Sequence, residues 1–331
     1  MQCVATALVY ARLTSRRMII DWRDPMYSDD GRNVFGRYFA RPDSGSLADL
    51  KDSSLSVAPG IWSGNLDEPV MEFMRRIGTA SPLDPATWRP YTIDPRRLDY
   101  REAVAVFWSP FDLIDDIRKH FSGELAPWRR KTRRDILRGI FREEFIPVAS
   151  VTERVESFRA AEFRTPVIGI HVRFTDRRCR LPAIVRRLSK LLKRHPGATI
   201  FLATDNLEVE RRFQSEFANV KAIPKWFSPV GGTIHRSRLA VGRTENGIAA
   251  LTDLYLLSEC DYLIIDEHSS FGLVAAWLSN IPWSRIYNVQ LIRVLPLRIR
   301  RLAWYYRERL RSRVFRRTAG WGARDRLEQL W

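Results

Sequence analysis

The stretch TPVIGIHVRFTD at residues 165–176 holds the clearest structural signal in the chain. Its uninterrupted apolar run at 166–172 is typical of a strand that is buried on both faces. Similar runs recur as TIFLAT at 199–204 and YLIID at 262–266, with a shorter one at 220–223. Apolar residues repeat at helical spacing between these runs, at 181–192, 206–217, 246–258 and 269–278. This alternation predicts parallel βαβ units and an α/β fold.

The first half of the chain is less regular. Residues 41–66 are rich in Pro, Gly, Ser and Asp, and four more prolines lie between 80 and 96, so short elements and loops are expected there. The predicted regular elements are a helix at 2–12, a strand at 17–21, a strand at 103–108 and a helix at 132–145. A domain boundary near 147–165 predicts three units, at 1–155, 156–289 and 290–331.

The composition is that of an ordinary globular protein. The 331 residues are 45% apolar and 28% charged, which excludes a disordered, collagen-like or disulfide-scaffold protein. The three cysteines, Cys3, Cys179 and Cys260, are too few for a disulfide framework and favour a reducing cytoplasm. No stretch approaches the ~20 apolar residues of a transmembrane helix, so a cytoplasmic protein is expected.

The net charge of +17 is concentrated near the C-terminus. The segment LRIRRLAWYYRERLRSRVFRR at 297–317 holds nine Arg and one Glu, and its apolar residues fall on one helical face. Three interpretations remain open for this basic C-terminal helix. In the first, the helix packs on the domain with its Arg side chains in water. In the second, it binds an anionic membrane surface, and in the third, it binds nucleic acid. Arg richness also fits a GC-rich genome.

Ligands of parallel α/β sheets bind beyond the carboxyl ends of the strands, so the residues that follow each strand are the candidate site. His171 and Arg173 lie at the first such end, on one side of the strand. Arg173 suits the oxygens of a diphosphate, and the alternative is a structural pairing with a carboxylate. Asp205 follows the next strand, where it either contacts a ribose or base edge or caps the following helix.

Two further features complete the candidate site. The segment Ser269-Ser270-Phe271-Gly272 opens a helix, whose backbone N–H groups and hydroxyls can bind an anion; a plain helix cap is the alternative. Asp253 lies inside an apolar helix and needs a partner such as a base or an Arg, unless it lies on a solvated face.

Several catalytic motifs are absent from the sequence. The chain contains no GxxxxGK[ST] loop, no HExxH, no CxxC pair, no GxSxG and no Asp-x-Asp. A phosphate site without an acidic metal cradle is expected to use Arg, helix dipoles and hydroxyls, which are the groups found at the strand ends. No metal site is predicted.

Four motifs occur together and in order: VIGIHVRFTD (167–176), FLATDN (201–206), TENGIAALTDLYLLSECDYLI (244–264) and SSFG (269–272). Their combination resembles the α1,6-fucosyltransferase family. The stretch ALVYARLTSRRMIIDWRDPMYSDDGRNVFGRYF (7–39) is similar to the N-terminal part of the bacterial members, the rhizobial nodulation fucosyltransferases. The resemblance covers roughly residues 1–283.

The resemblance implies a GT-B-like fold, with two Rossmann-type domains facing a cleft and GDP-fucose bound mainly by the second. It implies inverting, metal-independent transfer of fucose to a glycan. Arg173 would bind the β-phosphate and stabilise the departing GDP. His171 and Asp253 would hold the guanine, and Ser269 and Ser270 would meet the diphosphate. Asp205 would line the same cleft, and Phe271 would also belong to the donor-binding residues.

Three departures from the family pattern concern the acceptor side. The family's Gly-containing loop and first strand would precede residue 1. The segment after the HVR motif is compressed to FTDRRCRLP, in which Asp176 is the one carboxylate and is assigned as the base. Phe174 replaces the family's second basic residue.

The acceptor is expected to be an oligosaccharide or a lipid-linked glycan met at the inner membrane, where 297–317 would act as a peripheral anchor. Two other functions stay open. One is a non-catalytic relative that binds a GDP-sugar or a glycan. The other is a basic nucleic-acid-binding protein.

Overall fold

A computed structural model describes residues 1–24, 26–41, 45–52, 54–76, 88–175, 179–228, 242–267 and 269–289. Within these residues the second half of the chain forms a five-stranded sheet in which every strand pair is parallel. The spatial order is β5-β4-β3-β6-β7. The strands are β3 (Val167–Val172), β4 (Thr199–Thr204), β5 (Val220–Lys221), β6 (Tyr262–Ile265) and β7 (Ile286–Asn288).

The order of the strands places a switch point beside β3. The chain moves outward from β3 to β4 and β5, and then returns to place β6 on the other side of β3. In register, His171 lies beside Ala203 of β4, and Ile170 lies beside Ile264 of β6. A crevice opens at the carboxyl ends of strands where such a reversal occurs, and this is where open α/β sheets bind ligands.

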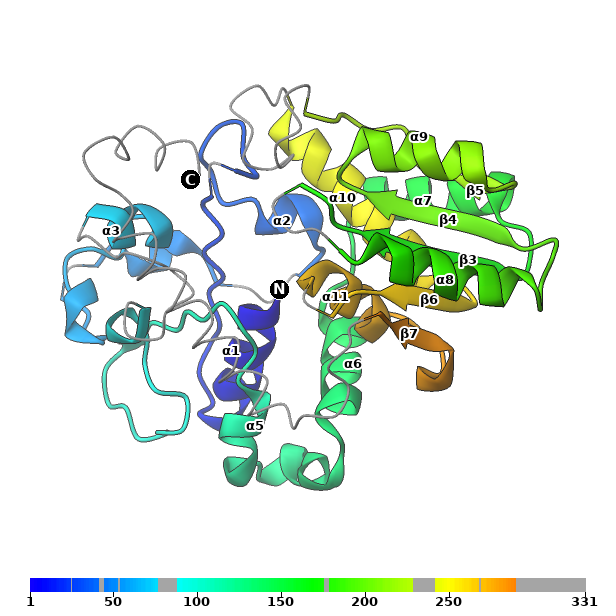
Figure 1. The fold of residues 1–331 in the computed structure, drawn as a ribbon. Helices are drawn as coiled ribbons and strands as arrows, with labels where there is room; N and C mark the ends of the chain where they lie inside the picture. Colours follow the sequence, from blue (N-terminus) through cyan, green and yellow to red (C-terminus); the bar gives the residue numbers. More distant parts are fainter. Residues whose placement is uncertain are drawn as a thin grey trace, which may run out of the picture.

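Helices cover both faces of the sheet because alternate side chains of each strand point to opposite faces (Figure 1). Ile168 and Ile170 belong to one core, formed with α8 (Leu181–Leu192) and α9 (Leu207–Glu216). Val167 and Ile265 belong to the other core. The helices on that second side are α7 (Ala149–Glu162), α10 (Arg243–Ser258) and α11 (Ser270–Leu278).

The N-terminal half holds short elements, as the sequence predicts. Its strands β1 (Val57–Ala58) and β2 (Val104–Ala105) form a two-stranded parallel sheet. The α-helices among its described residues are α1 (Gln2–Leu13), α2 (Phe35–Tyr38), α3 (Val70–Arg76), α5 (Ile114–Ile117) and α6 (Arg133–Glu144). The 3₁₀ helices in the described part of the chain are η1 (Leu47–Leu50), η2 (Gly60–Trp62), η3 (Arg89–Tyr91), η4 (Arg118–His120), η5 (Gly123–Arg130) and η7 (Trp283–Arg285).

Three predicted strands differ from the structure, and the one expected at 220–223 is shortened to Val220–Lys221. The strand predicted at 103–108 is reduced to Val104–Ala105. The strand predicted at 17–21 is wrong, because the segment has no strand pairing. The side chain of Asn33 takes the place of a neighbouring strand. It donates to the Ile20 carbonyl at 2.6 Å and accepts from the Trp22 N–H at 3.1 Å.

The two halves of the chain share one core. Buried residues of α1 and α6, such as Leu8 and Phe141, pack in the same cluster as Leu254 of α10 and Trp277 of α11. Arg138 of α6 donates to the carbonyls of Ala276 and Ile281 at 3.2 and 2.9 Å. The predicted boundary at 155/156 falls inside α7, and residues 290–331 lie outside the described residues. This division into units stays a prediction.

Gly169 lies at the centre of the middle strand, where the backbone packs closely against the end of α10. A Cβ there would lie 2.7 Å from Cys260 Sγ and 2.8 Å from Leu263 Cδ2. We expect Gly169→Ala to lower the free energy of unfolding by about 1–3 kcal/mol, because an overpacked core must shift. Denaturant unfolding measures this difference. Gly197→Ala is the matched control, since no atom lies within 4 Å of its Cβ position, and equal stability of the two variants would contradict the packing.

Candidate active site

A cavity of about 410 Å³ opens at the carboxyl end of β3, at the switch point of the sheet. It brings together six of the predicted site residues: His171, Arg173, Asp205, Asp253, Ser270 and Phe271. These six come from the ends of β3 and β4 and from α10 and α11. The N-terminal half also contributes lining residues, among them Met1, Trp22, Met26, Tyr27 and Tyr38. The cavity therefore lies between the two halves of the chain.

The remaining predicted residues are placed differently. Ser269 precedes α11 as its N-cap and is buried, with no hydrogen-bond partner for its hydroxyl among the described residues, but it does not line the cavity. Asp176 lies outside the described residues.

The backbone at Arg173 is held by hydrogen bonds on both sides. The Arg173 N–H donates to Cys179 Sγ at 3.4 Å, and the Cys179 N–H donates to the Arg173 carbonyl at 3.0 Å. Asp205 accepts from the Phe174 N–H at 2.7 Å and from the Thr175 hydroxyl at 2.5 Å. Both carboxylate oxygens of Asp205 therefore fix the loop that carries Arg173, while Asp205 also lines the cavity. The helix cap after β4 is the next residue, Asn206, which accepts from the Val209 N–H at 2.9 Å.

His171 presents a neutral imidazole to the cavity. Burial is the main cause that lowers the pKa of His171 to about 3, and the charges of Arg173 and Lys225 lower it further. The ring stacks on Phe271 with 4.9 Å between centroids. Its Nδ1 is buried without a hydrogen-bond partner among the described residues. At neutral pH this side chain therefore offers a hydrogen-bonding atom and a flat surface, without a charge.

Asp253 forms a buried ion pair that the sequence did not reveal. Lys225, in the segment after β5, pairs its ammonium with Asp253 Oδ2, and the two side chains are only 5% and 6% exposed. Asp253 Oδ1 has no partner among the described residues. Burial, the largest cause, raises the pKa of Asp253, and the nearby ammonium opposes that shift. Both residues line the cavity, so an acceptor and a donor lie side by side in its wall.

The two halves are also joined at the start of α10. Asp29, from the N-terminal half, accepts from the backbone N–H groups of Arg243 and Thr244 at 2.7 and 3.0 Å. Its carboxylate satisfies two of the free N–H groups at the helix end and complements the helix dipole. Nearby, α10 packs closely against Tyr38. A Cβ at Gly247 would lie only 2.1 Å from the Tyr38 hydroxyl oxygen, so a residue with a Cβ would clash there.

We expect Asp29→Ala to lower the free energy of unfolding by about 1 kcal/mol, the usual cost of losing a helix cap. The hydrogen bond from the Thr244 N–H is the largest cause that lowers the pKa of Asp29. A depressed pKa means that this stabilisation is present above the pKa of the unfolded state and is lost as pH falls through the folded value. Unfolding at pH 7 and pH 3 measures the loss. Asp99→Ala is the control, because the Asp99 side chain is 78% exposed and pairs with Arg97 on the surface. It should change the free energy of unfolding little. An equal loss of stability in the two variants would contradict the capping role of Asp29.

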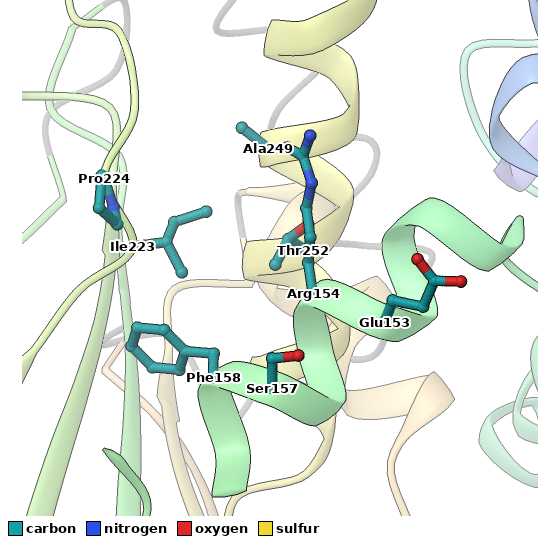
Figure 2. A pocket seen from close by; sticks show the side chains of 8 residues that line it. All are labelled: Glu153, Arg154, Ser157, Phe158, Ile223, Pro224, Ala249 and Thr252. Atoms are coloured by element: carbon teal, nitrogen blue, oxygen red, sulfur yellow. The ribbon is translucent and has the colours of Figure 1, made fainter. Parts of the chain in front are cut away.

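A second cavity, of about 470 Å³, lies on another side of α10 (Figure 2). Its lining comes from α7, from α10 and from the segment after β5, and includes Phe158, Ile223 and Thr252. None of the predicted site residues lines it. Ala249 of α10 lines both cavities, whereas Thr252 lines only the second cavity and its neighbour Asp253 lines only the first.

No cluster of three His, Cys, Asp or Glu residues that could hold a metal ion occurs in the described part of the chain. None of the helices in the same part is long and apolar enough to span a bilayer.

Comparison with known proteins gives consistent matches. The sequence model of the family "Nodulation protein Z (NodZ)" matches residues 126–281. Nodulation protein Z of Bradyrhizobium diazoefficiens is 26% identical over 291 residues, covering 79% of this chain and 70% of the relative. The protein of that name from Azorhizobium caulinodans is 24% identical over 317 residues, covering 88% and 87%.

Solved structures show the same fold. The crystal structure of fucosyltransferase NodZ from Bradyrhizobium covers 82% of this chain and 86% of its own, at 20% identity and a TM-score of 0.53. A NodZ α1,6-fucosyltransferase soaked with GDP-fucose covers 83% and 87%, at 21% identity and a TM-score of 0.53. The fold is thus the GT-B fold of these fucosyltransferases. In sequence and in fold, this chain is therefore similar to nodulation protein Z, and a solved structure of that protein is described as an α1,6-fucosyltransferase.

Proposed function

We propose that the protein transfers fucose from GDP-fucose to a glycan hydroxyl. The observation that carries this proposal is the cavity at the sheet's switch point, where Arg173, His171 and Asp253 converge with the start of α11. A NodZ α1,6-fucosyltransferase with the same fold was soaked with GDP-fucose. The donor needs a cation for its diphosphate and hydrogen-bonding groups for its base, and the cavity wall supplies both kinds of group.

The proposed reaction is a single displacement. The acceptor oxygen forms a bond to the anomeric carbon as the bond from that carbon to the β-phosphate oxygen breaks, so the anomeric configuration inverts. Negative charge grows on the departing GDP, and Arg173 stabilises it. The proton of the acceptor hydroxyl passes to a base, a role we assign to Asp176 because of the family resemblance.

Arg173, the N-terminus of α11 and the Ser270 hydroxyl would take the place of a metal at the diphosphate.

The test is release of GDP from GDP-fucose by the full chain in the presence of EDTA, with and without an oligosaccharide acceptor. GDP release in EDTA, with fucose found on the acceptor, is the expected result. Binding of GDP without any release would instead identify a non-catalytic GDP-sugar-binding relative. Release that EDTA abolishes would contradict the metal-independent step.

We also propose that the basic segment at 297–317, outside the described residues, holds the protein at an anionic membrane surface, where a lipid-linked glycan would be met. Nine Arg with aromatic residues in one segment support this proposal. Co-sedimentation with vesicles containing phosphatidylglycerol tests it. Deletion of 290–331 should abolish sedimentation and leave GDP binding intact. Vesicle binding that survives the deletion, or tight binding to duplex DNA with a steep salt dependence instead, would contradict it.

A further inference from the structure

The buried pair of Lys225 and Asp253 brings three polar atoms together in the cavity wall. Asp253 Oδ1 is an acceptor without a partner among the described residues, Oδ2 is an acceptor, and the Lys225 ammonium beside Oδ2 is a donor. Both side chains are almost fully buried and both residues line the cavity. A buried charged pair with an open hydrogen-bonding position is costly unless a ligand completes it.

The free edge of guanine carries the complementary sequence of groups. Its 2-amino group and N1–H are donors, and the neighbouring O6 is an acceptor. Adenine has an acceptor at N1, which would face the acceptor Oδ2. Its 6-amino group is a donor, which would face the donor ammonium of Lys225. Uracil places an acceptor at O2, where Asp253 Oδ1 also accepts. Of these three bases, only guanine matches acceptor, acceptor and donor together.

We propose that Lys225 is a specificity-determining residue, which selects guanine by donating a hydrogen bond to O6 while Asp253 accepts from N1–H and the 2-amino group. This inference rests on the proposed GDP-fucose site and assigns a role to a residue outside the strand-end motifs. A lysine suits it because an ammonium carries three donors, so it can hold Oδ2 and O6 at the same time. Lys225 therefore keeps its partner when the base arrives.

The experiment compares nucleoside diphosphates that differ at one position. Calorimetry on the full chain measures the affinities of GDP, 6-thio-GDP, IDP, ADP and UDP. Sulfur in place of O6 is a weaker acceptor, so 6-thio-GDP should bind about 10-fold more weakly than GDP, and IDP should lose a similar factor because it lacks the 2-amino group. ADP and UDP should bind at least about 1,000-fold more weakly than GDP, as expected when buried polar groups are left unmatched.

Lys225→Met, a substitution of similar length, separates the role of the ammonium. It should weaken GDP binding about 10- to 100-fold and remove the difference between GDP and 6-thio-GDP. Lys221→Met is the matched control, since Lys221 lies four residues earlier on β5 and pairs with Glu162 on the surface. Lys221→Met should leave the relative affinities for GDP, 6-thio-GDP, IDP, ADP and UDP unchanged.

The outcomes separate this inference from the proposed function. GDP binding by the wild-type protein with equal affinity for 6-thio-GDP overturns the contact between Lys225 and O6, and leaves the donor site standing. The same contact is overturned if the Lys225→Met variant still binds 6-thio-GDP as much more weakly than GDP as the wild-type protein does. No binding of any guanine nucleotide overturns both. The comparison of nucleotides on the wild-type protein decides the question even if Lys225→Met does not fold.

Discussion

Arg173→Ala should reduce the rate of GDP release from GDP-fucose by about 100- to 1,000-fold, the largest effect that we expect from any single substitution. Arg173 lines the cavity at the carboxyl end of β3, and the loop that carries it is fixed by Asp205 and Cys179. In the proposed reaction, a cation held there would stabilise the charge that develops on the leaving diphosphate. Its loss should therefore reduce the catalytic rate more than GDP binding. Steady-state kinetics with GDP-fucose and an acceptor measures both.

Arg180→Ala is the control for Arg173→Ala. Arg180 is exposed, precedes α8 as its N-cap residue, and does not line the cavity. Its substitution should leave the rate unchanged within about twofold, and Arg173→Lys should restore part of the lost activity, because the charge remains but the fork of donors does not. An Arg173→Ala variant with the wild-type rate would show that the leaving group is stabilised elsewhere.

Asp253→Asn should abolish measurable GDP binding, with a loss of at least about 100-fold in affinity. The amide would replace one of the two acceptors that face the base with a donor. It would also leave Lys225 buried beside a neutral group, because the two side chains form a nearly unexposed ion pair. The free energy of unfolding should fall by about 3 kcal/mol, the usual cost of breaking a buried pair. Calorimetry with GDP and thermal unfolding measure the two effects separately.

Thr252→Val is the matched control on the same helix. Thr252 is equally buried but lines the second cavity, and its hydroxyl donates to the Ile248 carbonyl within α10 (Figure 2). Its isosteric replacement should leave GDP affinity unchanged. If both substitutions abolish GDP binding, the loss reflects damage to α10 and not the removal of a base contact.

The sequence predicted the second half of the chain well for a physical reason. Strands buried on both faces read as continuous apolar runs, and β3, β4 and β6 lie within one or two residues of their predicted bounds. The parallel order then places their carboxyl ends together, so the strand-end rule brought His171, Arg173 and Asp205 to one cavity. The site on this side follows from pattern and topology.

Other parts of the site depend on contacts that no periodic pattern records. Lys225 follows a two-residue strand in an irregular segment, and its pairing with Asp253 spans 28 residues. Asp29 caps α10 across more than 200 residues. The segment at 17–21 has the apolar residues of a strand, but the Asn33 side chain satisfies its backbone where a strand was expected. Such side-chain replacements for regular structure are set by the tertiary fold.

The most direct test of the central claim is a calorimetric titration of the full chain with GDP. The cavity formed by Arg173, Asp253 and the start of α11 predicts binding of one GDP per chain, with GDP-fucose competing for the same site. Arg173→Ala and Asp253→Asn should each weaken that binding. A folded wild-type protein that binds neither GDP nor GDP-fucose would contradict the account.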